Sequence, residues 1–278
     1  MELLCNKIIY VISDLHMGCG GIKDNFLPYK NRLISFLDQI EKDSCVILAG
    51  DTFEFWQSSH GEVIKAHLDI IKKLQKLNSI FIVGNHDMDL SGFVDLDVEW
   101  PFIKSLCHDV KIKRNGKNIF ICHGDIFDKY INTDKLILLA RMSAMILGWS
   151  KERFNISNNG MDDIVEGFLE KRVLDLFNFL SKVANILFRR TASGRVGRGK
   201  KICYIRKELD KYHENNPNIF MICGHTHKAG WYKDWHVNTG SWNGKSSYYL
   251  RISKNGEITL HEFPSNKICN KKIWKTEK

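Results

Sequence analysis

Residues 7–16, KIIYVISDLH, are a run of apolar and β-branched side chains that ends on Asp14 and His16. Such a run predicts a buried strand followed by a polar loop. Four more runs end in the same way: CVILAGD on Asp51, IFIVGNHD on Asn85, His86 and Asp87, IFICHGD on His123 and Asp125, and IFMICGHTH on His225 and His227. We therefore expect these polar endings to meet where parallel strands leave a sheet, the edge at which open α/β sheets bind ligands.

Each ending taken alone is more typical of a turn than of a metal site, because Asp, Asn and Gly are common turn residues. The five together are different, since they supply carboxylate and imidazole groups in one region of the fold. The set as a whole favours a ligand-binding site over a purely structural role.

The segments between these strands predict the rest of the core. Residues 29–41 and 61–77 carry apolar side chains at helical spacing and fit crossover helices between parallel strands. Asn115-Gly116 is a hairpin turn signal between strands at 111–113 and 118–122, and a further helix follows Lys201. Residues 235–239, 246–252 and 257–263 are expected to be closing antiparallel strands, with Asn255-Gly256 as a turn.

The strand and helix alternation stops after the HGD motif. Residues 136–149 are apolar nearly all round, and residues 165–187 carry one apolar stripe opposite charged side chains. We predict a core formed by residues 1–129 and 202–265, a helical insertion at 130–201 and a basic tail at 266–278. The insertion fits a lid over a lipid or other apolar ligand and, with equal weight, a plain helical hairpin that covers the core.

Composition places the chain among globular proteins with a sizeable core, at 278 residues and 44% hydrophobic content. The eight cysteines form no CxxC pair, and the first strand follows the start directly without room for a signal peptide, so we expect a cytoplasmic protein. No apolar run is long enough to span a bilayer.

The net charge of +9 implies an anionic partner. Part of this charge lies in RRTASGRVGRGKK, residues 189–201, where Arg189 and Arg190 are candidate contacts for substrate phosphates. A solvated, solubilising surface explains the same charge equally well.

Seven candidate metal ligands follow from the strand endings: Asp14, His16, Asp51, Asn85, His123, His225 and His227. They are too many for one ion, whereas two ions that share Asp51 would use them all. Oxygen ligands mixed with imidazoles suit manganese, which we prefer, or iron, zinc, cobalt or nickel. Two divalent ions roughly 3.5–4 Å apart can hold a phosphoryl oxygen and activate a water for attack at phosphorus. The chemistry expected is phosphoester hydrolysis.

His86 follows a candidate ligand but is not needed in either ligand set. It is placed to protonate the leaving oxygen or to donate a hydrogen bond to a nonbridging oxygen, with Asp87 expected to orient its ring. The alternative is that His86 is a spare metal ligand.

The motifs D-x-H at Asp14, GD at Gly50, GNHD at Gly84, HGD at His123 and GHTH at Gly224 resemble the five signatures of the calcineurin-like metallophosphoesterases. The resemblance implies an α/β (α+β) fold of two packed mixed β-sheets flanked by helices, here with a helical insertion. It also implies that Asp14, His16, Asp51 and His227 hold one metal, and that Asp51, Asn85, His123 and His225 hold the other.

Within that superfamily, GDTFEFW, GNHD, HGDIFD, the helical insertion and HVNTGSW resemble the bacterial UDP-2,3-diacylglucosamine pyrophosphatases of lipid A synthesis. This resemblance implies a nucleotide-linked lipid substrate, an apolar lid for acyl chains and peripheral contact with the inner face of the membrane. A phosphodiesterase, nuclease or phosphatase for soluble phosphoesters or protein stays open, and the net charge leaves nucleic acid as a possible partner. A non-catalytic binding module would be expected to have lost ligands, and none is lost.

Overall fold

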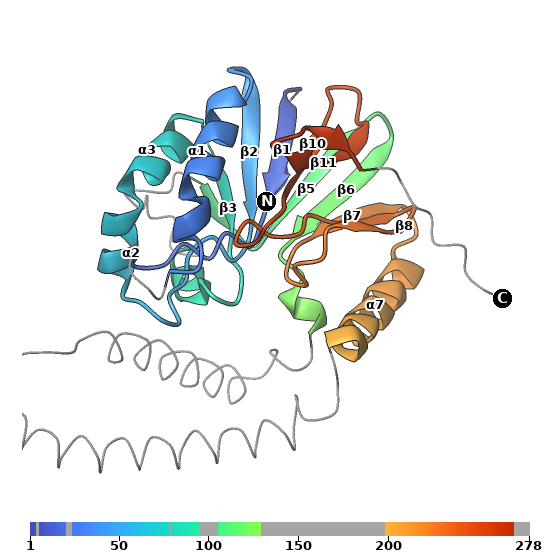
Figure 1. The fold of residues 1–278 in the computed structure, drawn as a ribbon. Helices are drawn as coiled ribbons and strands as arrows, with labels where there is room; N and C mark the ends of the chain where they lie inside the picture. The colour runs from blue at the N-terminus through green and yellow to red at the C-terminus, as the bar shows by residue number, and fades with distance from the viewer. Residues whose placement is uncertain (4–5, 21–23, 78, 95–104, 129–197, 270–278) are drawn as a thin grey trace, which may run out of the picture.

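The computed structural model describes residues 1–3, 6–20, 24–77, 79–94, 105–128 and 198–269. Within this part of the chain, two mixed β-sheets pack face to face between helices (Figure 1). The fold is therefore of the α/β class with two packed sheets, as the resemblance to the metallophosphoesterases implies.

The larger sheet has the strand order β12-β11-β10-β1-β2-β3-β4. These strands are β1 (Ile8–Ile12), β2 (Ser44–Ala49), β3 (Ile80–Ile82), β4 (Ser105–Cys107), β10 (Ser247–Ile252), β11 (Ile258–Phe263) and β12 (Lys267–Ile268). The strands β1 to β4 are parallel, and β10 pairs antiparallel with β1.

The smaller sheet has the order β5-β6-β7-β9-β8. Its strands are β5 (Asp109–Arg114), β6 (Lys117–Cys122), β7 (Ile219–Cys223), β8 (Gly230–Lys233) and β9 (His236–Asn238). The pairs β6–β7 and β7–β9 are parallel, so the carboxyl ends of β6 and β7 point to one edge of this sheet.

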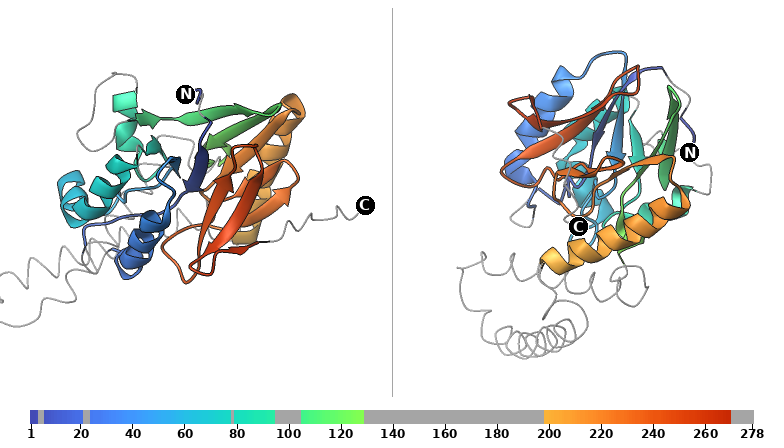
Figure 2. Two further views of the ribbon diagram at one scale, coloured as in Figure 1. Left: turned by 90° about the horizontal axis from the view of Figure 1, so that it is seen from above. Right: turned by 90° about the vertical axis from the view of Figure 1, so that its right-hand side faces the viewer.

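The apolar side chains form three layers, one on each outer face of the sheet pair and one between the sheets. Neighbouring residues of a strand contribute to different layers because they face opposite sides of the sheet. Tyr10 and Ile12 of β1 face α1 (Lys30–Gln39) and α3 (Leu68–Lys76). Ile9 and Val11 face the smaller sheet and pack with Ile119 and Ile121 of β6. On the outer face of the smaller sheet, Phe120 and Met221 pack against Ile205 and Leu209 of α7 (Arg198–Asn215). The two further views in Figure 2 show α7 lying along the smaller sheet, away from α1.

The predicted helix at 61–77 is wrong as a single helix. The structure has α2 (His60–Ala66) and α3, separated at His67, whose φ of −124° is not helical. The His67 ring is fully buried, with Nε2 2.7 Å from an Asp24 carboxylate oxygen. This tertiary contact interrupts a sequence pattern that is helical throughout.

Short elements complete the fold: α4 (Ser91–Val94) and the 3₁₀ turns η1 (Leu27–Tyr29), η2 (Met88–Leu90) and η3 (Asp125–Phe127). The strands β4, β8 and β12 were not predicted, and β12 falls within the expected basic tail. The helix α7 begins at Arg198, three residues before the predicted end of the insertion. The predicted helices at 136–149 and 165–187, together with Arg189 and Arg190, lie outside the described residues.

No helix in the described ranges combines the length and the apolar character needed to cross a bilayer. The described cysteines are all free thiols.

Candidate metal centre

The carboxyl ends of β1, β2 and β3 in one sheet meet those of β6 and β7 in the other. This junction brings together all seven candidate ligands, as the strand endings predict. Two groups made of candidate ligands alone have ligand atoms within 4.8 Å of one another: Asp14, His16, Asp51 and His227, and Asp51, His123 and His225. A third group with the same spacing joins His16 to Glu54 and His86. Asn85 joins the second group through Oδ1, which lies 3.2 Å from His123 Nε2.

Asp51 belongs to both groups. Its Oδ2 lies 3.2 Å from His123 Nε2 and 3.7 Å from His16 Nε2, so one carboxylate oxygen faces a ring from each sheet. Its Oδ1 accepts a hydrogen bond from the backbone N–H of His86 at 2.9 Å. Only 1% of the residue is exposed. Asp51 is therefore fixed in the position of a shared ligand.

Backbone strain is concentrated at this junction. Five candidate ligands have left-handed φ angles, between 51° and 65°: Asp14, His16, Asp51, His225 and His227. Each such angle is unfavourable for a residue with a Cβ atom and persists only where the surrounding structure enforces it. The strain turns the side chains that follow the strands toward a common point.

Glycines in the motifs leave space for these side chains. A Cβ atom on Gly50 would overlap the His123 ring, one on Gly84 would overlap the Asp51 carboxylate, and one on Gly224 would overlap Asp14. The glycine of each GD, GNHD and GHTH motif is therefore required by close approach to a ligand side chain.

Three of the histidines are oriented by a second partner on the side away from the junction. His16 Nδ1 lies 3.3 Å from Glu54, His123 Nδ1 donates to the Ala49 carbonyl at 3.0 Å, and His225 Nε2 lies 2.9 Å from Asp128. Such contacts fix the tautomer and the ring orientation of a metal-binding histidine.

The His86 ring is held by Glu54 and Trp56. A Glu54 carboxylate oxygen lies 2.8 Å from His86 Nδ1, and the Trp56 ring stacks on the imidazole with centroids 3.9 Å apart. Nδ1 is therefore the hydrogen-bonded nitrogen, which leaves Nε2 for a substrate oxygen.

The expected orientation of His86 by Asp87 is wrong. Both carboxylate oxygens of Asp87 accept hydrogen bonds from backbone N–H groups, those of Gly84, Thr52 and Phe53. Burial raises the pKa of Asp87 to about 7, and the charge of Asp51 acts in the same direction. Asp87 thus joins the loops after β2 and β3 rather than contacting the imidazole.

Glu54 and Asp128 were missed in the sequence, although a repeated pattern marks them. GDTFE at 50–54 and GDIFD at 124–128 both place an acid four residues after the glycine. In both loops that acid contacts a histidine of the junction. Asp125 of the HGD motif instead begins η3 and belongs to neither ligand group.

Residues 8–229 match the family model of the calcineurin-like phosphoesterases. The match spans more than half of the chain and contains all five motifs. The chain belongs to this family. It is therefore a metallophosphoesterase, a hydrolase of phosphoester bonds from a family that depends on two metal ions.

No curated protein matches the sequence of this phosphoesterase. Solved structures align with it weakly. A dimetal phosphatase from Danio rerio is 11% identical, with 92% of this chain and 95% of that chain covered and a TM-score of 0.42. An archaeal phosphodiesterase is 14% identical, with 92% and 99% covered and a TM-score of 0.41. Vacuolar protein sorting 29 from Cryptosporidium parvum is 12% identical, with 95% and 94% covered and a TM-score of 0.38.

The ligand atoms of the first group have the spacing that one divalent cation requires. Nitrogen and oxygen ligands lie about 2.0–2.2 Å from a divalent ion such as zinc, so neighbouring ligand atoms are roughly 3 Å apart. Here His227 Nε2 is 3.1 Å from Asp14 Oδ1, and His16 Nε2 is 3.2 Å from His227 Nε2. The mixed imidazole and oxygen donors fit manganese, iron, zinc, cobalt or nickel.

Two buried carboxylates of the junction are held in the ionised form by the histidines around them. Burial raises the pKa of Asp51, but the charges of His123, His86 and His16 outweigh burial and hold that pKa well below its usual value. Burial likewise opposes ionisation of Glu54, yet its contacts with His16 and His86 lower its pKa to about 2. Both carboxylates are therefore ionised at neutral pH and available to balance positive charge.

Proposed function

We propose that this phosphoesterase hydrolyses the pyrophosphate bond of a nucleotide-linked lipid of the UDP-2,3-diacylglucosamine type. Two divalent ions, preferably manganese, would bind at Asp14, His16, Asp51 and His227 and at Asp51, Asn85, His123 and His225. The observation that carries the hydrolytic part is the position of Asp51, whose Oδ2 faces histidines of both groups.

The bound ions would supply positive charge to the phosphoryl oxygens and lower the pKa of an attacking water. The chain supplies the remaining groups. Glu54 accepts a hydrogen bond from His86 Nδ1, and Trp56 stacks on the ring, so that Nε2 is left for the substrate. His86 then donates a proton to the leaving oxygen, or a hydrogen bond to a nonbridging one.

The lipid part of the proposal rests on the sequence. The motifs GDTFEFW, HGDIFD and HVNTGSW resemble those of the pyrophosphatases of lipid A synthesis, and the apolar residues 136–149 would form part of the lid. Arg189 and Arg190 would contact headgroup phosphates, and the insertion would cover acyl chains. Such an enzyme would be cytoplasmic and would meet its substrate at the inner face of the membrane.

Hydrolysis of a lipid-linked nucleotide and of its deacylated counterpart tests this proposal directly. Burial of hydrocarbon is worth about 0.8 kcal/mol for each CH₂ group, so acyl chains held by the protein should produce a large preference. Met145→Gln in the insertion should lower hydrolysis of the acylated substrate and leave bis(p-nitrophenyl) phosphate unaffected, with exposed Lys72→Gln as the matched control. Equal rates on the acylated and deacylated substrates would exclude the lipid function.

A second candidate is a phosphodiesterase, nuclease or phosphatase for soluble phosphoesters, which the net charge of +9 favours. Single-stranded DNA and a phosphomonoester in the same hydrolysis assay separate this candidate from the first. It is supported if either is hydrolysed faster than the lipid-linked nucleotide.

A further inference from the structure

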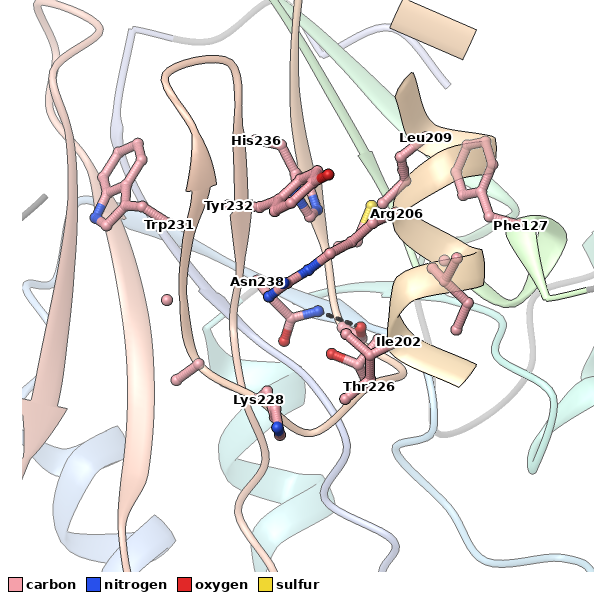
Figure 3. A pocket seen from close by; sticks show the side chains of 16 residues that line it. Phe127, Ile202, Arg206, Leu209, Thr226, Lys228, Trp231, Tyr232, His236 and Asn238 are labelled. Carbon is pink, nitrogen blue, oxygen red and sulfur yellow. Dashed lines mark hydrogen bonds between the residues drawn. The ribbon is translucent and has the colours of Figure 1, made fainter. Parts of the chain in front are cut away.

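A cavity of about 280 Å³ lies beside the metal centre, enclosed by α7, the loop after β7 and the strands β8 and β9 (Figure 3). None of the seven candidate ligands lines it. Two of its wall residues, Gly224 and Thr226, alternate along the chain with His225 and His227. The cavity and the metal centre therefore share the GHTH loop.

The charge of the described cavity wall is entirely positive. Arg206 and Lys228 line it, and no Asp or Glu does. The Arg206 guanidinium lies over the Tyr232 ring, 4.5 Å from its centroid, and Figure 3 shows the side chain reaching across the cavity from α7. Such a wall favours an anionic ligand.

His236 supplies unused hydrogen-bonding groups at this cavity. The residue is 4% exposed, and neither ring nitrogen has a hydrogen-bond partner among the described residues. The Cys223 thiol lies beside the ring, but a thiol is a weak partner. A buried polar group without a strong partner is unfavourable, so the ring nitrogen that does not face Cys223 is available to a ligand.

The remaining wall is apolar and partly aromatic, formed by Ile202, Ile205, Leu209, Phe127, Trp231 and Tyr232. Flat aromatic side chains can stack on a planar ring of a ligand. An acyl chain fits less well, because it would remove Arg206 and His236 from water without offering them a hydrogen bond. The volume is near the small end of ligand pockets, which span about 300–1,000 Å³.

We propose that this cavity binds a nucleoside monophosphate group, with the phosphate at Arg206 and Lys228 and the base hydrogen-bonded to His236. The ligand is either a free nucleotide or the nucleotide part of a substrate. Asn238 connects the cavity to the metal centre, because its side-chain amide donates to the Gly224 carbonyl of the GHTH loop. The proposal does not depend on a lipid substrate, since it concerns binding of the nucleotide alone.

Isothermal titration calorimetry tests the site with four probes: UMP, AMP, uridine and inorganic phosphate. The full chain is used, both as wild type and as Asp51→Asn, in which phosphate binding through metal ions should be weakened. At least one nucleoside monophosphate should bind Asp51→Asn about tenfold more tightly than uridine or phosphate. Arg206→Gln and Lys228→Gln in the Asp51→Asn background should each weaken nucleotide binding about tenfold. His236→Phe should weaken nucleotide binding more than it weakens binding of inorganic phosphate, because His236 contacts the base.

Exposed Lys72→Gln is the matched charge control and should leave the affinity unchanged. Lys228 is also exposed, so its substitution tests the site even if Arg206→Gln or His236→Phe lowers stability. The proposal is overturned if neither UMP nor AMP binds. It is also overturned if Lys228→Gln leaves the affinity for the nucleotide unchanged.

Hydrolysis distinguishes the two sources of the ligand. If the nucleotide is part of the substrate, Lys228→Gln should raise KM for a nucleotide-linked pyrophosphate more than it raises KM for bis(p-nitrophenyl) phosphate. If it is a free nucleotide, the variant should change both KM values by the same factor while weakening nucleotide binding. Equal hydrolysis of acylated and deacylated substrates would contradict the proposed lipid substrate. It would not contradict nucleotide binding at this cavity.

Discussion

Two regions of the molecule bury Asp and His side chains against one another, with different results. Asp24 lies 2.7 Å from His67 and also accepts hydrogen bonds from the backbone N–H groups of Gly20, Phe26 and Leu27. Its carboxylate is satisfied by the chain itself. At the junction of the two sheets, by contrast, rings and carboxylates from five strand ends face one another, and two imidazole nitrogens lie 3.2 Å apart.

The difference shows that a buried Asp–His contact does not by itself make a metal site. What marks the junction is a surplus of ligand atoms directed at one place by strained backbone. Five residues there have positive φ angles, whereas His67 does not. Such strain is tolerated in the folded protein where contacts between the ligands and a bound ion offset its energetic cost.

Asp51→Asn should have the largest effect on hydrolysis. It removes the negative charge that both ligand groups share, so metal content should fall and the rate should drop by at least about 10²-fold. Asp24→Asn is the matched control, since it makes the same change in a buried Asp–His contact and should keep the metals. Equal metal content in the two variants would remove the distinction between the regions.

His86→Gln should lower turnover by about 10²–10⁴-fold while metal content stays unchanged. Substrates with good leaving groups need less protonation and should lose least. A series of aryl phosphodiesters of graded leaving-group pKa measures this dependence. Uniform losses across the series, or loss of a metal ion, would instead make His86 a ligand.

Glu54→Gln should have a smaller effect, about 10–100-fold on turnover, because the residue orients His86 and His16 without touching the substrate. Residues that act as a unit have non-additive effects. The Glu54→Gln/His86→Gln double variant should therefore be little slower than His86→Gln. Fully additive losses would show that Glu54 acts independently of His86.

The strand endings could be predicted from the sequence because they depend on local pattern. Buried strands have recognisable apolar runs, and parallel strands place their carboxyl ends at one edge. All seven candidate ligands were identified in this way. The helix break at His67 could not be predicted, since it depends on Asp24, which is 43 residues away.

The partners of the histidines depend on loop conformation rather than on periodicity. Asp87 follows His86 directly and was the expected partner, but its side chain turns toward the backbone of the loop after β2. Glu54 reaches His86 from a loop 32 residues away. The repeated GDxF-acid pattern at 50–54 and 124–128 was the available signal for the second partners.

Asp24→Asn should affect stability without affecting hydrolysis. Burial opposes ionisation of Asp24, but the contact with His67 outweighs it and lowers the pKa of Asp24 below its usual 3.8. The contribution of the ionised Asp24 carboxylate is therefore present above about pH 3.8 and is lost as pH falls through the folded-state pKa of Asp24. The variant should lose about 1–3 kcal/mol of unfolding free energy at neutral pH.

Urea unfolding of chelator-treated protein between pH 7 and pH 3 measures this difference without interference from metal loss. The difference in unfolding free energy between wild type and Asp24→Asn should become smaller as pH falls toward 3. A difference in unfolding free energy that grows as pH falls would contradict the assigned charge of Asp24.

Titration of Mn²⁺ onto chelator-treated wild-type protein, with hydrolysis followed in the same samples, tests the central claim most directly. Two ions should bind to each chain, and hydrolysis should return as the second site fills. A chain that binds no transition metal and keeps full activity in excess chelator would contradict the assignment of the junction as a metal centre.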